Sequence, residues 1–444
     1  MNRKNVIYLG FRGRTSRTPW FLTITEAARR EVQLPHHSRL RVRTSPNATP
    51  VILPVEPHTQ NTPQKEMLVP IRVQKNKQGI VLGPIIGILT VQRRGRPSFR
   101  GNRSNFRDII EMGRRLGLTV VVFTPEGLIS SEMTECYIHT GAEQQRGRWK
   151  RVILPVPSVV YNRIPDRIAE VNPEVQGAKS WLEEHGIPLF NDQFFDKGML
   201  YDWLAESPET SCFLPETAAF TAPREIVRWM RRHPLVYLKP VDGKAGDGII
   251  QVRTEPFGFR VTYQSNGKRT RNEYATAKEM ARAVWRRTRG RSYLIQQGIE
   301  LAAFDGRQFD LRVLIQKNRY GRWRVTGIGA RVADSDGITT HVPNGGQIER
   351  DLHALRAAFG EERALSIWRR AREQAVKIAE AIERSSSTQG RLLGEMSMDI
   401  GVATDGSLWF FEANAKPMKF DEPFIRAKSL LRLLHYCDFL ARSQ

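Results

Sequence analysis

The amino-acid sequence predicts a protein of several domains that combines α/β and α+β organisation. Its 444 residues are enough for two or three domains. Hydrophobic residues make up 40% and aromatic residues 9% of the chain, which is too rich for a disordered protein. From residue 79 onward, apolar segments typical of buried strands alternate with segments typical of amphipathic helices. No long uncharged apolar run is present, so we expect a soluble protein without a membrane span.

The first part of the chain, residues 1–78, is predicted to be a basic β-rich domain. The first hundred residues hold 18 Lys and Arg against 4 Asp and Glu, so they carry more than half of the net charge of +23. Short β-rich segments such as Arg39–Arg43 and Val51–Val55 are separated by prolines, which favours a small antiparallel β-domain. The positive charge favours anionic partners but does not choose among nucleotides, nucleic acid, acidic polymers and membrane surfaces.

Residues 79–190 are predicted to form a small α/β domain. The nearly continuous apolar run Ile80–Val91 predicts one strand that is buried on both faces. The apolar stripe of Asn105–Leu116 predicts a helix that ends at Gly117, and Leu118–Phe123 predicts a second buried strand. Together these elements predict a right-handed βαβ unit.

The remaining residues, 191–444, mix helices such as Pro223–Arg232 and Ala364–Arg384 with hairpin-like strands, which predicts an α+β region. The three cysteines of the chain lie far apart and form no CxxC pair, so we expect neither a disulfide framework nor a structural zinc site. The N-terminal apolar stretch Val6–Leu9 is too short for a secretory signal. We therefore expect a cytoplasmic protein.

A glycine-rich loop follows an apolar strand that ends in Lys239. Its members Gly243, Lys244, Gly246 and Gly248 would let backbone N–H groups approach a polyphosphate, with Lys239 facing the same charge. The loop is not a Walker A motif, because the lysine precedes the glycines and a strand follows them. An ordinary glycine-rich hairpin is the competing interpretation.

Near the C-terminus, the Asp405-Gly406 turn predicts a hairpin that sets Asp399 and Glu412 on neighbouring strands. Acidic residues inside apolar strands are costly to bury unless they have partners. Asp399, Glu412 and Asn414 would form an all-oxygen site suited to Mg²⁺ that is held against phosphate oxygens. The competing interpretation is a half-buried hairpin whose acids face solvent.

Two further segments would complete a nucleotide site. The apolar strand Tyr293–Gln297 breaks at Gly298, so Gln296 and Gln297 could contact an adenine edge while Ile299 packs on the ring. In a second segment, polar and apolar residues alternate, so Asp310 and Arg312 share one strand face and bring a guanidinium beside the phosphates. A salt bridge on an exposed face is the alternative.

Taken in order, these motifs resemble those of the ATP-grasp superfamily, and in particular of its YheC/YheD family, which is described as endospore coat-associated. The resemblance spans nearly the whole chain. It rests on LGPIIGILT at Leu82–Thr90, VVYNRIPDR at Val159–Arg167, FFDKGMLYDWL at Phe194–Leu204, YLKPVDGKAGDGI at Tyr237–Ile249, YLIQQGI, FDLRVLIQ, Arg331, the NGG at Asn344–Gly346 and the final MDIG and FFEANAKP.

The resemblance implies an ATP-grasp fold over residues 191–444, with ATP in the cleft between two lobes, preceded by a pre-ATP-grasp α/β domain. It also implies a set of site residues: Lys197 and Lys239 for the phosphates, Gly243–Gly248 for a mobile lid, Gln296, Gln297 and Ile299 for adenine, Asp310 near the nucleotide, Arg312 and Arg331 for the transferring phosphoryl group, and Asp399, Glu412 and Asn414 for metal. Gln297 departs from the glutamate that many ATP-grasp ligases carry there.

The function that the resemblance implies is an ATP- and Mg²⁺-dependent ligase. ATP would convert a carboxylate into an acyl phosphate, which an amine or thiol would then attack, with two Mg²⁺ ions, or Mn²⁺ instead, on the phosphates. The resemblance further implies a role in spore formation, with spore coat components as partners. The basic surroundings suit an acidic substrate, but the sequence does not identify the substrate pair.

Two other functions compete with this one. The first is a non-catalytic, coat-associated protein that keeps the ATP-grasp fold and uses its basic N-terminal region to bind acidic polymers. The second is nucleic-acid binding through the arginine runs Arg93–Arg96 and Arg286–Arg291, which we do not expect because no recognised module accompanies them.

Overall fold

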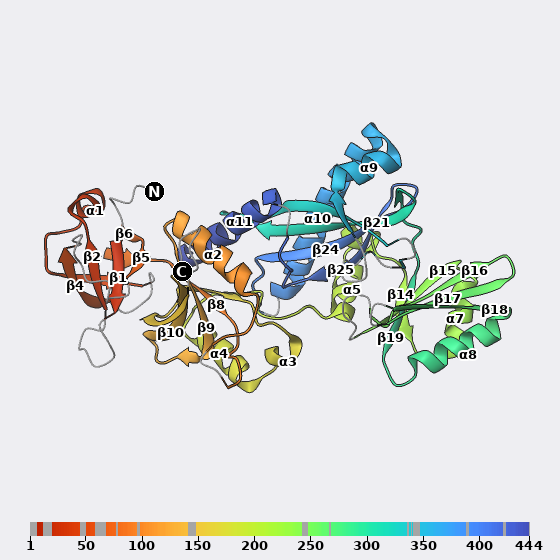
Figure 1. Ribbon diagram of the computed structural model, residues 1–444, viewed down its shortest axis with the longest axis horizontal. Coiled ribbons are helices and arrows are strands. Elements are labelled where there is room, and N and C mark those ends of the chain that lie inside the picture. Colours follow the sequence, from red (N-terminus) through yellow and green to blue (C-terminus); the bar gives the residue numbers. More distant parts are fainter. Residues whose placement is uncertain are drawn as a thin grey trace.

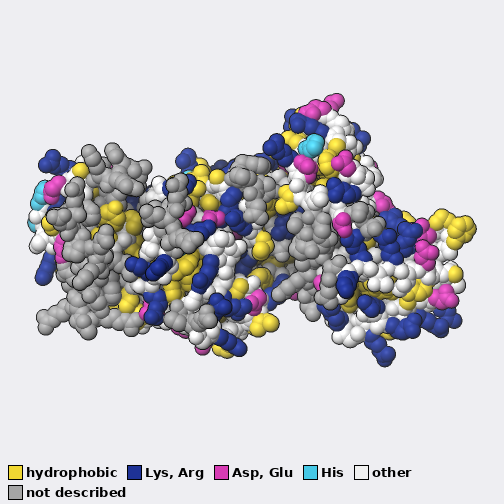
Figure 2. Space-filling view, viewed as in Figure 1, with side chains coloured by type: hydrophobic (Ala, Val, Ile, Leu, Met, Phe, Trp, Pro, Cys, Tyr) yellow, Lys and Arg dark blue, Asp and Glu magenta, His cyan; other side chains and the backbone are white. Residues whose placement is uncertain are grey.

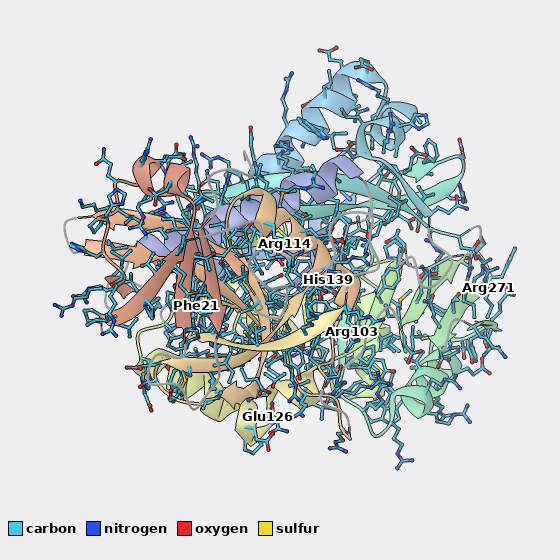
Figure 3. All side chains as sticks on the ribbon, turned by 60° about the vertical axis from the view of Figure 1, so that its left-hand side comes forward. Phe21, Arg103, Arg114, Glu126, His139 and Arg271 are labelled. Atoms are coloured by element: carbon cyan, nitrogen blue, oxygen red, sulfur yellow. The ribbon has the colours of Figure 1, made fainter. Side chains whose placement is uncertain are left out.

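The computed structural model describes residues 7–11, 20–44, 50–57, 68–76, 79–95, 98–140, 148–241, 247–265, 268–334, 337–338, 340, 347–387, 390–420 and 423–443. Four sheets succeed one another along an elongated molecule, with the N-terminal sheet at one end (Figure 1). Phe21 in the first sheet and Arg271 in the third lie at opposite ends (Figure 3). None of the described helices is long and apolar enough to span a bilayer.

The N-terminal unit, residues 7–82, is β-rich as predicted, and the strands that the structure describes there run in the order β5-β1-β2-β4-β3-β7-β6. The outermost strands of this order, β5 and β6, are separated in the chain only by Arg72, so the sheet curls back on itself. The prediction of antiparallel pairing is wrong in part, because β2 pairs with β4 and β3 with β7 in parallel. The elements are β1 (Ile7–Phe11), β2 (Trp20–Ile24), α1 (Glu26–Glu31), β3 (Arg39–Arg43), β4 (Val51–Pro57), β5 (Val69–Ile71), β6 (Val73–Asn76) and β7 (Gly79–Leu82).

The predicted single strand Ile80–Val91 is wrong. The chain turns at Gly83, whose φ is +110°, and a Cβ at that position would lie 2.8 Å from the Ile85 nitrogen. The run is therefore divided between β7, in the first sheet, and β8, in the second. A local apolar pattern cannot show that two halves of one run belong to different sheets.

The predicted βαβ unit is confirmed, because β8 and β9 are parallel and α2 connects them. The sheet of this central unit has the order β11-β10-β9-β8-β12-β13. It packs on the N-terminal unit, where the Trp20 indole donates to the Ile153 carbonyl at 3.1 Å. The elements are β8 (Ile85–Leu89), α2 (Arg103–Arg115), β9 (Thr119–Leu128), β10 (Met133–His139), β11 (Trp149–Pro155), β12 (Val159–Asn162), α3 (Arg167–Glu170), α4 (Pro173–Glu184) and β13 (Leu189–Phe190).

The third sheet forms a small lobe at the other end of the molecule, with the order β14-β19-β15-β16-β17-β18 and antiparallel pairing throughout. Apolar residues of α7 and α8 pack on this sheet in one core. Lys and Arg side chains gather over the lobe (Figure 2). The elements are β14 (Thr217–Phe220), α7 (Pro223–Met230), β15 (Leu235–Pro240), β16 (Ile250–Glu255), β17 (Gly258–Ser265), β18 (Lys268–Tyr274), α8 (Ala277–Thr288) and β19 (Tyr293–Gln297).

The fourth sheet, with the order β23-β22-β21-β24-β25, forms a large lobe between the central unit and the small lobe (Figure 1). The long helix α10 packs its apolar side on one face of this sheet, and α11 shares a core with α2 of the central unit. The opposite face of the sheet is turned toward the small lobe. The elements are α5 (Lys197–Ala205), α6 (Pro208–Ser211), β20 (Ala303–Phe304), β21 (Arg307–Lys317), β22 (Trp323–Val332), β23 (Gln347–Arg350), α9 (Asp351–Phe359), α10 (Glu361–Ser387), β24 (Glu395–Val402), β25 (Leu408–Asn414) and α11 (Pro423–Arg442).

Asn191, directly after β13, joins the central unit to the large lobe. Its side chain is fully buried, and Nδ2 donates to the carbonyls of Glu395, at 2.7 Å, and Ala415. Its Oδ1 accepts from the backbone N–H of Gly394 at 2.8 Å and of Glu395 at 3.3 Å. One side chain therefore fixes the beginning of β24 and the end of β25.

Candidate functional site

A cavity with a volume of about 340 Å³ lies where the small lobe, the large lobe and the central unit meet. The small lobe contributes residues of β15 and β19, and the large lobe contributes the face of its sheet opposite α10. The central unit contributes the short segment around α3, together with Phe194. Most of the predicted site residues line this cavity.

On β21, the predicted alternation holds. Phe309, Leu311 and Val313 belong to the core of the large lobe, so Asp310 and Arg312 face the other way. Asp310 lines the cavity, whereas Arg312 contacts Asp399 on the neighbouring strand rather than the cavity itself. The period of two along the strand is what places both polar residues on the cleft face.

Asp310 and Arg331 are direct cross-strand partners and form a buried bidentate ion pair. Arg331 Nε donates to Asp310 Oδ1 at 2.9 Å, and Nη2 donates to Oδ2 at 2.6 Å. The Thr340 hydroxyl also donates to Asp310 Oδ2, at 2.6 Å. Burial alone would lower the pKa of Arg331, but the charges of Asp310 and Asp399 outweigh it and raise that pKa above its ordinary value. Arg331 is therefore a permanent cation in the wall of the cavity.

Asp399 lies between two arginines. Arg312 Nη1 is 2.9 Å from Asp399 Oδ1, and Arg331 Nη2 is 2.9 Å from Oδ2. Asp399 is also the direct cross-strand partner of Glu412, as the hairpin prediction required. Asn414 Nδ2 donates to Glu412 Oε1 at 2.9 Å, so the three predicted metal residues form one contiguous group on β24 and β25.

The donor atoms of this group fit Mg²⁺, because the two carboxylates and the amide offer hard oxygen ligands. Within the described part of the chain, no three His, Cys, Asp or Glu side chains come together as a metal site. A bound Mg²⁺ ion would therefore take only a few protein oxygens and complete its coordination with water or phosphate oxygens. That coordination is usual for Mg²⁺ at phosphate-binding sites.

A bulge in β25 turns Phe411 into the cavity. The register shifts so that Asp399 pairs with Glu412 while the next residue, Ile400, pairs with Phe410. Phe411 and Glu412 consequently both line the cavity, although strict alternation would place them on opposite faces. Lys239 Nζ lies 5.4 Å from the centroid of the Phe411 ring, which is a cation–π distance.

Opposite that sheet, Lys239 projects from the end of β15 in the small lobe. Its Nζ is 2.5 Å from Gln296 Oε1, and the amide nitrogen of Gln296 donates to the hydroxyls of Tyr201 and, at 2.9 Å, of Thr217. Burial raises the pKa of the Tyr201 phenol, which therefore stays neutral and can accept this hydrogen bond. Gln296 thus lines the cavity with its amide oriented by three side chains.

The other residues expected at the adenine end lie in the same wall. Gln297 Oε1 accepts from the Glu216 backbone N–H at 3.2 Å, and Ile299 is buried. Both line the cavity next to Gln296.

Several predicted residues lie outside the described part of the chain. They are Gly243, Lys244 and Gly246 of the expected lid, the NGG at 344–346, and the side chain of Lys197, whose backbone begins α5. Gly248 is described: its φ is +77°, and its carbonyl accepts from the Tyr293 hydroxyl at 3.1 Å.

Sequence reasoning missed several residues that line the cavity. Tyr237 lies two positions before Lys239 on β15, so strand alternation could have identified it. Phe411 depends on the bulge, and Thr340, Arg167 and Phe194 reach the cavity only through long-range packing. No local pattern marks those four.

Comparison with known proteins identifies the family. A family model described as "YheC/D like ATP-grasp" matches residues 186–440, which is more than half of the chain. The chain belongs to the YheC/D-like ATP-grasp family. This confirms the resemblance on which the ATP-grasp expectation rested, and the cavity lies within the matched region except for its wall around α3.

Two relatives of this YheC/D-like chain come from Bacillus subtilis (strain 168). The endospore coat-associated protein YheD is 28% identical over 398 residues, which are 85% of this chain and 84% of YheD. The endospore coat-associated protein YheC is 20% identical over 290 residues, which are 64% of this chain and 75% of YheC.

Solved structures resemble the YheC/D-like chain more distantly. The ATP-grasp ligase PsnB, solved with a minimal precursor, is 16% identical and has a TM-score of 0.46, covering 82% of this chain and 99% of PsnB. D-alanyl-alanine synthetase A from Vibrio cholerae is 12% identical with a TM-score of 0.46, covering 81% of this chain and 98% of its own.

Proposed function

We propose that this YheC/D-like protein is an ATP- and Mg²⁺-dependent ligase that joins a carboxylate to an amine or thiol and acts in bacterial spore formation. The observation that carries the proposal is the placement of opposite charges on the two lobes. Lys239 projects from the small lobe, and the oxygen donors Asp399, Glu412 and Asn414 line the facing sheet of the large lobe. A nucleotide tail between them would meet a lysine on one side and metal ligands on the other.

The reaction would proceed in two steps. A carboxylate oxygen of the first substrate attacks the γ-phosphorus, the bond to the β–γ bridging oxygen breaks, and ADP leaves. The amine nitrogen, or the thiol sulfur, then attacks the acyl carbon and loses a proton, while the carbon–oxygen bond breaks and phosphate leaves with the electron pair. Mg²⁺, when bound, would neutralise charge on the β- and γ-oxygens.

The protein side chains contribute binding, orientation and charge. Arg331 is a permanent buried cation beside Asp399, so it would stabilise the negative charge of the transferring phosphoryl group. Arg312 would also stabilise this charge once Asp399 binds a metal ion in place of the Arg312 guanidinium. Gln296, Gln297 and Ile299 would hold the adenine, with Gln296 already oriented by Lys239, Tyr201 and Thr217.

A non-catalytic, coat-associated protein that binds acidic polymers remains the alternative function. The names of both Bacillus relatives and the 18 Lys and Arg among the first hundred residues favour it. The intact set of oxygen donors opposite Lys239 favours the ligase, because a binding module has no need of a metal group on apolar strands.

Trapping of the acyl phosphate tests the proposal. Full-length protein is incubated with Mg²⁺-ATP, pooled carboxylates and hydroxylamine, and ADP release and hydroxamate masses are followed. We expect carboxylate-dependent ADP release that Glu412→Gln abolishes and that Glu184→Gln, an exposed change on α4, leaves intact. Full ADP release by Glu412→Gln would reject the metal assignment, and no carboxylate-dependent release with any pool would favour the binding protein.

A further inference from the structure

The central unit supplies a third wall of the cavity, to which the proposed nucleotide site assigns no role. Pro165, Asp166 and Arg167 from the beginning of α3, together with Phe194, form this wall. The nucleotide contacts proposed above all come from the two lobes. This wall is therefore available to a reactant other than ATP, and its side chains indicate which chemistry would suit it.

Arg167 is the cation of this wall. Its Nη2 donates to the Phe195 carbonyl at 2.5 Å, and its guanidinium carbon lies 5.5 Å from the centroid of the Phe194 ring. In the part of the chain that the structure describes, Arg167 has no carboxylate partner. Arg331, by contrast, already pairs with two aspartates. The guanidinium of Arg167 is held in place but keeps donors for an anion from outside, and it suits a carboxylate because it can bind both oxygens.

The neighbouring carboxylate, Asp166, does not cancel this charge. Its Oδ2 accepts from Arg100 Nη2 at 2.8 Å, and its Oδ1 caps α3 by accepting from the Ala169 N–H at 2.9 Å. Lys416 Nζ also lies near the Phe194 ring, 4.3 Å from its centroid, but its side chain is almost fully buried and pairs with Glu170. Arg167 is therefore the cation beside Phe194 that favours a negative group on the ligand.

Directly outside this wall, α3 and the residue that follows it present an exposed apolar surface. Ile168 is 85% and Val171 is 72% exposed, whereas Ala169 and Glu170 between them are buried. Residues three apart lie on the same side of a helical turn, so Ile168 and Val171 form one apolar strip beside Arg167. Figure 1 shows α3 on the edge of the central unit that faces the small lobe. A free amino acid bound at Arg167 would leave this strip in water, whereas a peptide chain would cover it.

We propose that the third wall is the binding site of an acidic peptide. A carboxylate side chain of the peptide pairs with Arg167 over the Phe194 ring, and adjacent apolar residues cover Ile168 and Val171. The inference names the substrate class of the proposed ligase and rests on that function for the meaning of the binding, but the binding itself can be measured without turnover.

Binding by full-length protein in Mg²⁺-ADP at physiological salt tests the site. The probes are a fluorescein-labelled peptide of repeating Leu-Gly-Glu and the same peptide with Gln in place of Glu. We expect the Glu peptide to bind roughly tenfold more tightly, in line with a charge-assisted hydrogen-bonded pair. Arg167→Gln should abolish this preference. Arg228→Gln, which removes an exposed arginine from α7, should retain it and controls for the loss of one positive charge.

The apolar strip is tested by the double change of Ile168 and Val171 to Ser. It should weaken the binding of both peptides by the same factor. N-acetylglutamate amide should still compete with the Glu peptide as it does in the parent protein. Three results would each overturn the proposal. The first is that the parent protein binds the two peptides equally or not at all. The second is that Arg167→Gln and Arg228→Gln lose the preference for the Glu peptide to the same extent, and the third is that the double change has no effect on peptide binding. Melting temperature and Mg²⁺-ADP affinity, both unchanged in Arg167→Gln, would show that the variant is folded and keeps its nucleotide site.

The two proposals fail in different ways. If Arg167-dependent peptide binding is found but no acyl phosphate forms with any carboxylate, the ligase is rejected and the peptide site stands. If acyl phosphate forms on small carboxylates but Arg167→Gln does not change peptide binding, the ligase stands and the peptide site is rejected.

Discussion

Arg312 and Asp399 are direct cross-strand partners on β21 and β24, and the guanidinium Nη1 lies 2.9 Å from the carboxylate Oδ1. The other oxygen of Asp399 is 2.9 Å from Arg331 Nη2. Both oxygens that we assign to a metal ion therefore already contact arginine. A divalent ion must compete with these arginines, and its binding would release them toward a phosphate.

This competition predicts that Arg312→Gln binds Mn²⁺ several-fold more tightly than the parent protein when no nucleotide is present. The substitution removes one competitor of the metal but leaves Arg331 to compensate the buried Asp399. Free Mn²⁺ can be followed by its electron paramagnetic resonance signal during a titration. The matched control is Arg324→Gln, on an exposed position of β22. Unchanged or weaker Mn²⁺ binding by Arg312→Gln would contradict the competition.

Gly401→Ala is expected to impair nucleotide binding with little loss of stability. A Cβ at Gly401 would lie 2.3 Å from Cζ of Phe411, so the ring must move. The ring can move at low cost because it faces the cavity, but its contact with Lys239 would change. Calorimetric titration with Mg²⁺-ADP, alongside thermal melting, measures both effects. A large drop in melting temperature with unchanged nucleotide affinity would contradict this expectation.

Replacing Asn191 separates its hydrogen bonds from its backbone conformation. Its φ is +55°, a conformation that glycine adopts more readily than alanine. Asn191→Gly should cost about 3–5 kcal/mol of unfolding free energy, because several buried backbone groups at the beginning of β24 and just after β25 lose their partner. Asn191→Ala should cost about 1 kcal/mol more, from strain at positive φ. Urea unfolding measures the free energy of unfolding of both variants. Equal losses of unfolding free energy in the two variants would show that the surrounding structure does not hold residue 191 at positive φ.

Lys416 predicts a pH dependence of stability. Burial lowers the pKa of this lysine from its usual 10.5 to about 8, although Glu170 beside it acts in the opposite direction. A lysine whose pKa is lower in the folded state opposes folding while it is protonated, and that penalty disappears as the pH rises from about 8 toward 10.5. The parent protein should therefore gain stability relative to Lys416→Met over this range. In the variant, Glu170 keeps Lys179 and Asn162 as partners. If the difference in melting temperature between the parent protein and Lys416→Met stays constant from pH 8 to 10.5, the lowered pKa of Lys416 is refuted.

Much of the site followed from local patterns in the sequence. Alternation on β21 placed Asp310 and Arg312 on one face, and the Asp405-Gly406 turn paired Asp399 with Glu412. Both patterns depend only on the pleat of a strand and on the geometry of a tight turn. They are therefore visible within a few residues of sequence.

The rest depended on contacts between distant segments. The break at Gly83 divides one apolar run between two sheets, and the parallel pairs of the N-terminal sheet join strands that are not consecutive. Thr340 reaches Asp310 from a separate segment, and the bulge at Phe411 shifts the strand register by one residue. Pairing partners and bulges are decided by tertiary packing, which no window of sequence records.

Nucleotide affinity tests the central claim most directly. Binding of a fluorescent ATP analogue to the full-length protein should require Mg²⁺ and should weaken roughly tenfold or more in both Lys239→Met and Glu412→Gln, because each change removes one side of a charged contact with the phosphates. Binding that is independent of Mg²⁺ and unaffected by both substitutions would contradict the assignment of this cavity to ATP.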